Sequence, residues 1–184
     1  MTEEIIIAGF GGQGVLSMGQ ILCYGGVIEG KEVSWMPSYG PEMRGGTANC
    51  VTILSDQKIS SPILNKFDTV IALNQPSLDK FESAVKPGGL LIYESSTILN
   101  PPKRNDIEIV AIEAANEATK LQNPKVMNMI ILGAFLQKKS IIKFDTALEA
   151  LKKVLPERYH HLIPLNKQAM EKGMELVENI SVAS

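Results

Sequence analysis

The sequence has few of the residues that carry redox or metal chemistry. Among its 184 residues are two cysteines, two histidines and one tryptophan. Cys23 and Cys50 belong to no C-x-x-C pair, so zinc or iron–sulfur ligation has no support. His160 and His161 are adjacent, and on a helix neighbouring side chains point about 100° apart, which makes a shared metal ion difficult. We therefore expect no metal site and no catalytic residue of its own in this chain.

The sequence also lacks a strong charge of one sign and a long apolar run. Eighteen basic and twenty acidic residues give a formal net charge of −2, so broad attraction to nucleic acid or anionic membrane is not indicated. No apolar run reaches the roughly 18 residues of a membrane-spanning helix. The N-terminus reaches Ile5 without the basic region of a secretory signal. With no paired cysteines, this favours a cytoplasmic protein without nucleic-acid or membrane partners.

Apolar runs and helical periodicity alternate along the first half of the chain. Residues 4–9 form an apolar run that stops at glycines, which is typical of a buried strand, and residues 14–29 have the spacing of a helix with one apolar face. We expect further strands over residues 31–36 (ended by Pro37), 48–54, 69–73, 90–93 and 107–112.

One more helix is predicted among the strands, and the chain from Glu113 onward is predicted to be helical. A helix over residues 76–85 is expected to end at Lys86-Pro-Gly-Gly89, and further helices are expected over about 113–122, 125–139, 144–155 and 164–180. Asp145 is the expected N-cap of the helix over residues 144–155. The pattern predicts one α/β domain over residues 1–184, a three-layer Rossmann-like sandwich with a mostly helical C-terminal third.

A glycine loop lies where the first strand meets the first helix. Gly9, Gly11 and Gly14 fit G-x-G-x-x-G. Glycine permits a tight turn and close approach of a ligand to the backbone, and the N–H groups of the first helical turn favour an anion such as a phosphate. Close contact between strand and helix would select the same glycines, so a purely structural role is equally open. The candidate cofactor-binding residues are Gly9, Gly11, Gly12, Gln13 and Gly14.

The usual partners of such a loop are missing. A dinucleotide site needs an acidic residue about 20 positions further on, at the end of the second strand. That strand ends in Val33-Ser-Trp-Met36, and Glu32 lies at its start. A Walker loop needs a lysine after its last glycine, where this sequence has Val15. NAD and ATP are both poorly supported.

The second motif is Ser38-Tyr-Gly-Pro-Glu-Met-Arg-Gly-Gly-Thr-Ala-Asn49, which has too few apolar side chains to be core. The guanidinium of Arg44 could grip a carboxylate or phosphate with two hydrogen bonds, and it could equally pair with Glu42 or with an acidic residue of another subunit. Trp35 and Met36 suit an interface anchor and suit core packing as well. The candidate interface residues are Tyr39, Gly40, Pro41, Glu42, Arg44, Gly45, Gly46 and Thr47, and Arg44 is also a candidate cofactor-binding residue.

These motifs together resemble one family. The segments Ile5-Ile-Ile-Ala-Gly-Phe-Gly-Gly-Gln-Gly-Val15, Ser38–Cys50 and Asn128-Met-Ile-Ile-Leu-Gly-Ala134, with a closing helix that holds Asn166, Ala169 and Gly173, are similar to the gamma subunit of 2-oxoacid:ferredoxin oxidoreductases. The similarity runs from end to end, and the Tyr-Gly-Pro-Glu-x-Arg-Gly-Gly-Thr loop is its most specific part.

The resemblance implies that this chain is one subunit of an oxidoreductase complex and is inactive when isolated. It implies oxidative decarboxylation of a 2-oxoacid with coenzyme A to acyl-CoA, carbon dioxide and reduced ferredoxin. Thiamine diphosphate, Mg and iron–sulfur clusters would belong to alpha, beta and ferredoxin-like delta partners, with ferredoxin as the electron acceptor. The glycine loop and Arg44 would face coenzyme A. The motif is similar to the 2-oxoglutarate or 2-oxoisovalerate branch, and the isolated chain could form a homodimer.

Two other interpretations stay open on the sequence. The first is a stand-alone nucleotide-binding enzyme that uses the glycine loop. The second is a structural scaffold in which the glycines serve turns alone.

Overall fold

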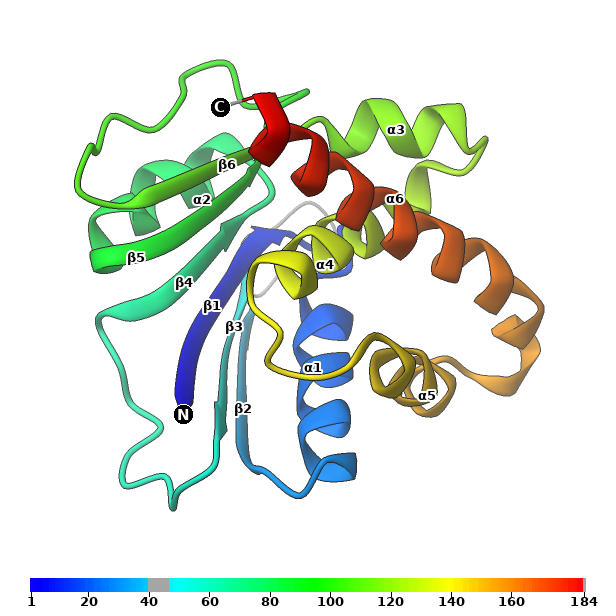
Figure 1. Ribbon diagram of the computed structural model, residues 1–184, viewed down its shortest axis with the longest axis horizontal. Helices are drawn as coiled ribbons and strands as arrows, with labels where there is room; N and C mark the ends of the chain where they lie inside the picture. Colours follow the sequence, from blue (N-terminus) through cyan, green and yellow to red (C-terminus); the bar gives the residue numbers. More distant parts are fainter. Residues whose placement is uncertain (40–46, 184) are drawn as a thin grey trace.

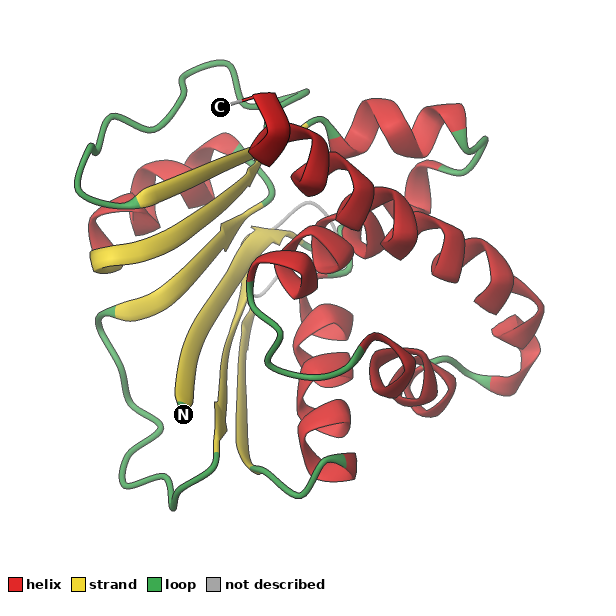
Figure 2. Ribbon diagram, in the orientation of Figure 1, coloured by secondary structure: helices red, strands yellow, loops and turns green. Residues whose placement is uncertain are grey.

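The computed structural model describes residues 1–39 and 47–183 (Figure 1). Strands of one sheet and the surrounding helices make up this part of the chain (Figure 2). The strands are β1 (Thr2–Phe10), β2 (Glu32–Tyr39), β3 (Thr47–Ser55), β4 (Phe67–Ala72), β5 (Val85–Glu94) and β6 (Glu108–Ile112). The helices are α1 (Val15–Ile28), α2 (Gln75–Phe81), α3 (Ala114–Lys120), α4 (Met127–Lys138), α5 (Phe144–Val154) and α6 (Ile163–Ala183), with short 3-10 segments η1 (Glu82–Ala84), η2 (Pro124–Val126) and η3 (Glu157–Leu162).

The sheet has the strand order β2-β3-β1-β4-β5-β6. β1, β4, β5 and β6 are parallel, and β3 runs antiparallel to both of its neighbours. From β1 the chain passes through α1 to the edge strand β2, whereas from β4 it passes through α2 to β5 on the other side. The carboxyl ends of β1 and β4 therefore flank a topological switch point, where ligands bind in open α/β sheets.

The two faces of the sheet carry separate cores, because side chains alternate along each strand. Ile5 and Ile7 of β1 face the larger core, which is shared with α1, α4, α5 and α6. Ile6 faces the smaller core, which α2 covers through Leu78. Figure 1 shows α2 on one side of the sheet and α1, α4 and α5 on the other. The expected three-layer α/β fold is confirmed.

The helical C-terminal part is anchored where α4 crosses α6. A Cβ atom on Gly133 would overlap the carbonyl oxygen of Met170, and a Cβ atom on Gly173 would overlap the carbonyl oxygen of Ile130. The two glycines therefore let the backbones of α4 and α6 come into direct contact. None of the helices in the described residues is long and apolar enough to cross a bilayer.

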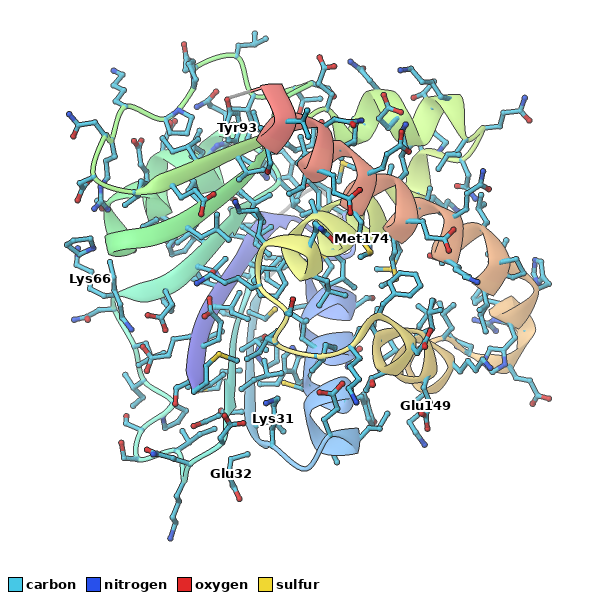
Figure 3. All side chains as sticks on the ribbon, in the orientation of Figure 1. Lys31, Glu32, Lys66, Tyr93, Glu149 and Met174 are labelled. Carbon is cyan, nitrogen blue, oxygen red and sulfur yellow. The ribbon has the colours of Figure 1, made fainter. Side chains whose placement is uncertain are left out.

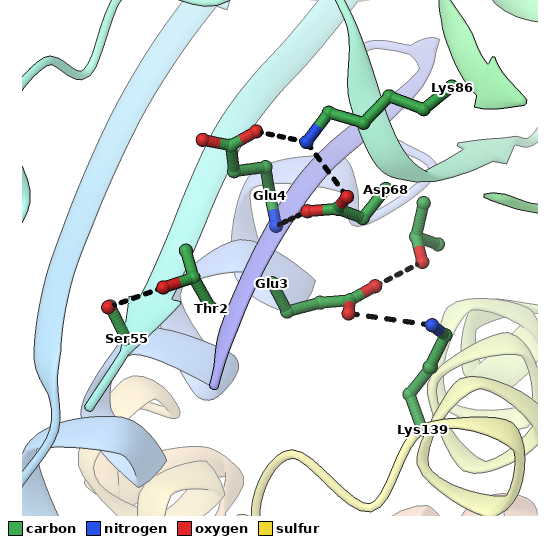
Figure 4. Close-up of polar contacts among 8 residues, drawn as sticks. Thr2, Glu3, Glu4, Ser55, Asp68, Lys86 and Lys139 are labelled. Atoms are coloured by element: carbon green, nitrogen blue, oxygen red, sulfur yellow. Dashed lines mark hydrogen bonds and ion pairs between the residues drawn. The ribbon is translucent and has the colours of Figure 1, made fainter. Parts of the chain in front are cut away.

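Polar side chains tie together the amino ends of β1, β4 and β5 (Figure 4). Lys86 Nζ contacts Glu4 Oε2 at 2.6 Å and Asp68 Oδ1 at 2.8 Å. Burial lowers the pKa of Lys86, but its hydrogen bonds to Asp68 and Glu4 outweigh burial and raise this pKa above the ordinary value. Glu3, which is 5% exposed, accepts a hydrogen bond from Thr69 Oγ1 at 2.5 Å. These contacts lie at the amino ends of the parallel strands, whereas the glycine loop lies at the carboxyl end of β1.

Two predicted boundaries are wrong for reasons of sheet position. Pro37 does not end the second strand, because β2 continues to Tyr39 with Pro37 opposite Cys50. β2 is an edge strand, where a missing N–H is tolerated. Lys86-Pro-Gly-Gly89 does not end a helix: α2 stops at Phe81, and β5 already begins at Val85. The strand is irregular there, and Gly88 has a φ of +75°.

A third boundary is also wrong. Lys143, not Asp145, is the N-cap of α5, and Asp145 lies in the first turn of the helix. A carboxylate in the first turn still interacts favourably with the helix dipole.

Candidate functional site

The glycine loop lies at the carboxyl end of β1 and leads directly into α1. Gly12 has a φ of +96° and Gly14 a φ of +77°, which is the left-handed region that favours glycine. At Gly12 a Cβ atom would meet nothing within 4 Å, so the loop backbone faces open space there. Gly9 is crowded instead, since its Cβ atom would lie 2.6 Å from Gln13 Oε1.

Gln13 holds the loop to the sheet. Its Oε1 accepts a hydrogen bond from Phe10 N at 2.7 Å, and its Nε2 donates to the carbonyl oxygen of Leu73 at 3.2 Å. Leu73 follows β4 and donates its own N–H to Ala8 at 2.9 Å. The loop is thus fastened across the topological switch point between β1 and β4.

The first turn of α1 opens into a hollow of about 350 Å³. Backbone N–H groups of Val15, Leu16 and Ser17 come before the first intrahelical hydrogen bond, from Met18 N to Gly14 O at 3.1 Å, and no side chain caps this end of the helix. Such N–H groups and the positive end of the helix dipole favour an anion. The hollow is lined by uncharged residues, namely Phe10, Gly11, Gly12, Gly14, Val15, Leu16, Ser17 and Ala48.

The second motif begins and ends beside the glycine loop. Thr47, the first residue of β3, pairs with Phe10, the last residue of β1. Tyr39, the last residue of β2, pairs with Ala48. Tyr39 and Thr47, which flank residues 40–46, therefore lie at the same end of the strands as the glycine loop. The predictions for Gly40, Pro41, Glu42, Arg44, Gly45 and Gly46 fall outside the described residues.

Asn128 is a site residue to which the sequence pattern assigned no role. It lies in the first turn of α4, is 8% exposed, and its Nδ2 is 3.4 Å from the carbonyl oxygen of Gly14. A Cβ atom on Gly14 would overlap Asn128. The only signal in the sequence was its place in the motif that begins Asn128-Met-Ile, since 114 residues separate the two partners.

The cysteine thiols are buried. Burial raises the pKa of Cys23 to about 12 and, against a hydrogen bond with Thr52, raises the pKa of Cys50 to about 11. Thiols with such pKa values stay protonated at neutral pH and are poor nucleophiles and poor metal ligands.

The histidines bond to the backbone of the helical part. His160 Nε2 lies 2.9 Å from the carbonyl oxygen of Leu155, and His161 Nδ1 lies 3.0 Å from that of Arg158. Within residues 1–39 and 47–183, no three His, Cys, Asp or Glu residues gather where they could hold a metal ion.

The family model described as pyruvate ferredoxin/flavodoxin oxidoreductase matches residues 4–176. The chain belongs to this family. Both candidate motifs and the α4–α6 crossing lie inside the matched residues.

Relatives in the family are subunits of oxidoreductases. The 2-oxoglutarate synthase subunit KorC of Methanocaldococcus jannaschii is 29% identical over 186 residues, which cover 98% of this chain and 96% of KorC. The ketoisovalerate oxidoreductase subunit VorA of Methanothermobacter thermautotrophicus is 36% identical over 179 residues, which cover 96% of this chain. This chain spans only 37% of VorA.

A solved structure of the family has the same fold. The crystal structure of the keto/oxoacid ferredoxin oxidoreductase gamma subunit from Geobacter sulfurreducens matches with a TM-score of 0.81 and 28% identity. The match covers 96% of this chain and 99% of that subunit. The family resemblance inferred from the motifs is confirmed.

Proposed function

We propose that this chain is the gamma subunit of a multi-subunit 2-oxoacid:ferredoxin oxidoreductase. The complex would oxidatively decarboxylate 2-oxoglutarate or 2-oxoisovalerate with coenzyme A, and would produce an acyl-CoA, carbon dioxide and reduced ferredoxin. The observation that carries the proposal is the match to KorC, which spans nearly all of both chains. The match to VorA supports 2-oxoisovalerate as the second candidate substrate.

The chain's own part in the reaction would be to hold coenzyme A on one side of the active site. Coenzyme A carries phosphate groups, and the hollow at the start of α1 offers the N–H groups of Val15, Leu16 and Ser17 without any acidic side chain to repel them. Gly9, Gly11, Gly12, Gln13 and Gly14 would shape the loop around the ligand. Arg44 would add a charged contact from the second motif.

The other cofactors of such a complex, thiamine diphosphate with Mg and iron–sulfur clusters, fit other subunits better than this one. Thiamine diphosphate with Mg needs oxygen ligands, and iron–sulfur clusters need several thiolates. The described part of this chain brings no such set together, and its buried cysteine thiols stay protonated. We therefore assign these groups to alpha, beta and delta subunits, and ferredoxin to the complex as electron acceptor.

The experiment compares Ser17→Glu with Ser17→Gln in the assembled complex. Glu and Gln have nearly the same size, and a carboxylate in the first turn does not destabilise a helix. It does repel a phosphate that sits on the same N–H groups. We expect Ser17→Glu to raise the KM for coenzyme A about tenfold or more relative to Ser17→Gln, with the KM for the 2-oxoacid unchanged.

Equal KM values for coenzyme A in the two variants would contradict the role of the hollow. A complex purified with this chain that oxidises no 2-oxoacid would contradict the proposed function itself. Tight binding of NAD or ATP to the isolated chain in calorimetry would favour the stand-alone nucleotide-binding enzyme instead.

A further inference from the structure

Helix α1 has an exposed face without charge. None of its residues from Val15 to Ile28 is acidic or basic. Its inner side packs against the sheet and α5, yet Tyr24, Val27 and Ile28 on its outer side are 46%, 58% and 38% exposed. These residues have the spacing i, i+3 and i+4, so they share one face. A solvent-exposed helix normally carries polar or charged side chains there.

A hollow of about 240 Å³ lies between this face and the edge strand β2. Trp35 of β2 forms one wall, and the other residues that line it are Gln20, Cys23, Tyr24 and Val27 of α1. Apolar and aromatic walls with no charge are typical of the centre of a protein interface, where charged residues are depleted. A hollow of this kind accepts an aliphatic or aromatic anchor from a partner.

Charged side chains lie at one end of this face. Lys31 pairs with Asp56 at 2.7 Å, and Glu32 is the first residue of β2. Figure 3 shows Lys31 and Glu32 at the end of the sheet far from the glycine loop. The other end of β2 leads into residues 40–46, which belong to the predicted interface motif. The uncharged face therefore has a polar rim at one end and continues toward the candidate site at the other.

Two relatives differ in how much polypeptide is joined to this domain. This chain spans 37% of VorA, so well over half of that subunit is a further polypeptide segment joined covalently to the same domain. KorC lacks such a segment, because 96% of it is matched. A domain that is fused in one relative and separate in another needs a surface that holds the separate partner. A permanent interface of this kind is mainly apolar.

We infer that the outer face of α1 and the hollow beside Trp35 bind the subunit that corresponds to the unmatched part of VorA. This inference rests on the proposed function only in requiring that a complex exists. The partner is expected to place an uncharged aliphatic or aromatic side chain between Tyr24 and Trp35, and to cover the open edge of β2.

The experiment uses the complex purified from the native cells through a tag on this chain. p-Benzoylphenylalanine is placed at position 24, at position 27 or, as a control, at position 99, where Leu99 is 84% exposed in a loop. After irradiation, we expect positions 24 and 27 to cross-link to a peptide of the subunit that corresponds to the unmatched part of VorA. Position 99 should give no such cross-link. Absence of a cross-link from both α1 positions, or one to a second copy of this chain, would overturn the inference.

A pair of charge substitutions gives an independent measurement. Val27→Glu is expected to retain at least tenfold less of the partner in the tagged complex than Leu99→Glu, while both isolated chains keep the wild-type melting temperature. Equal retention would overturn the inference. An assembled complex that cross-links as expected but oxidises no 2-oxoacid would contradict the proposed function and leave this interface standing.

Discussion

The amide of Gln13 joins the glycine loop to the neighbouring strand, with its Nε2 3.2 Å from the carbonyl oxygen of Leu73. The same side chain accepts the N–H of Phe10 at 2.7 Å. One side chain thus holds the glycine loop against the carboxyl end of β4, beside the proposed ligand site. Removal of the Gln13 side chain should loosen the glycine loop without disturbing the core.

Gln13→Ala should lower the free energy of unfolding by about 1–2 kcal/mol, because two hydrogen bonds are lost. The amide of Phe10 should also exchange with solvent faster, which NMR measures directly. Gln20→Ala is the matched control, since the Gln20 side chain makes no hydrogen bond with any described residue. Unchanged exchange at Phe10 would show that Gln13 does not hold the loop.

Gly173→Ala should lower the free energy of unfolding by roughly 3 kcal/mol or prevent folding, because its Cβ atom would overlap the backbone of α4 at Ile130. Gly25→Ala is the control: its Cβ atom meets only the flexible end of the Ile142 side chain. Ala is also the better helix former, so this control should change stability by about 1 kcal/mol or less. Urea denaturation followed by circular dichroism gives both values. A loss in Gly173→Ala as small as the one expected of Gly25→Ala would mean that α4 and α6 can separate at little cost.

Glu94 should stabilise the fold in a pH-dependent way. Burial raises its pKa, but hydrogen bonds from Thr97, Ser96 and Ala115 outweigh burial and bring the pKa below the ordinary 4.5. Its carboxylate is 0% exposed and accepts Thr97 Oγ1 at 2.6 Å. A depressed folded-state pKa contributes stability above the unfolded-state pKa, and this contribution is lost as the pH falls through the folded-state value.

Glu94→Gln should therefore cost about 2–3 kcal/mol at pH 7, since an amide N–H₂ replaces one acceptor oxygen. The difference from wild type should shrink as the pH falls below 4.5, where the wild-type carboxyl group takes up its proton. Chemical denaturation at several pH values between 7 and 3 measures this difference. Glu149→Gln, at an exposed position of α5, is the control and should change the free energy of unfolding at pH 7 by no more than about 0.5 kcal/mol. A difference that stays constant down to pH 3 would contradict the assigned pKa direction.

The two cysteines should resist alkylation in the native protein. With pKa values of about 12 and 11, Cys23 and Cys50 hold almost no thiolate at pH 8. Mass spectrometry should find neither thiol modified by iodoacetamide in the folded chain and both modified in urea. Rapid modification of Cys50 in the folded chain would mean that the first turn of α1, whose Val15 carbonyl lies 3.5 Å from its sulfur, opens readily.

Much of the local structure could be predicted because it depends on neighbouring residues. The run at Ile5–Ala8 and the helical periodicity after Gly14 predict β1 and α1, and both motifs stand out by their glycines. Pro37 and the Lys86–Gly89 segment misled the same reasoning. In both cases the sheet accommodates residues that usually end an element, because an edge strand and an irregular strand start need fewer ladder hydrogen bonds.

The sequence by itself determined the family, the two candidate motifs and the succession of strands and helices, since each of these is encoded in residues that lie close together along the chain. Only the tertiary structure decided that β3 inserts between β2 and β1, which brings Thr47 beside Phe10, and that α4 packs Asn128 against Gly14. It also decided which side of the uncharged helix α1 stays exposed. These outcomes depend on how whole elements pack against one another, and contacts between residues that lie far apart in the sequence leave no periodicity in it.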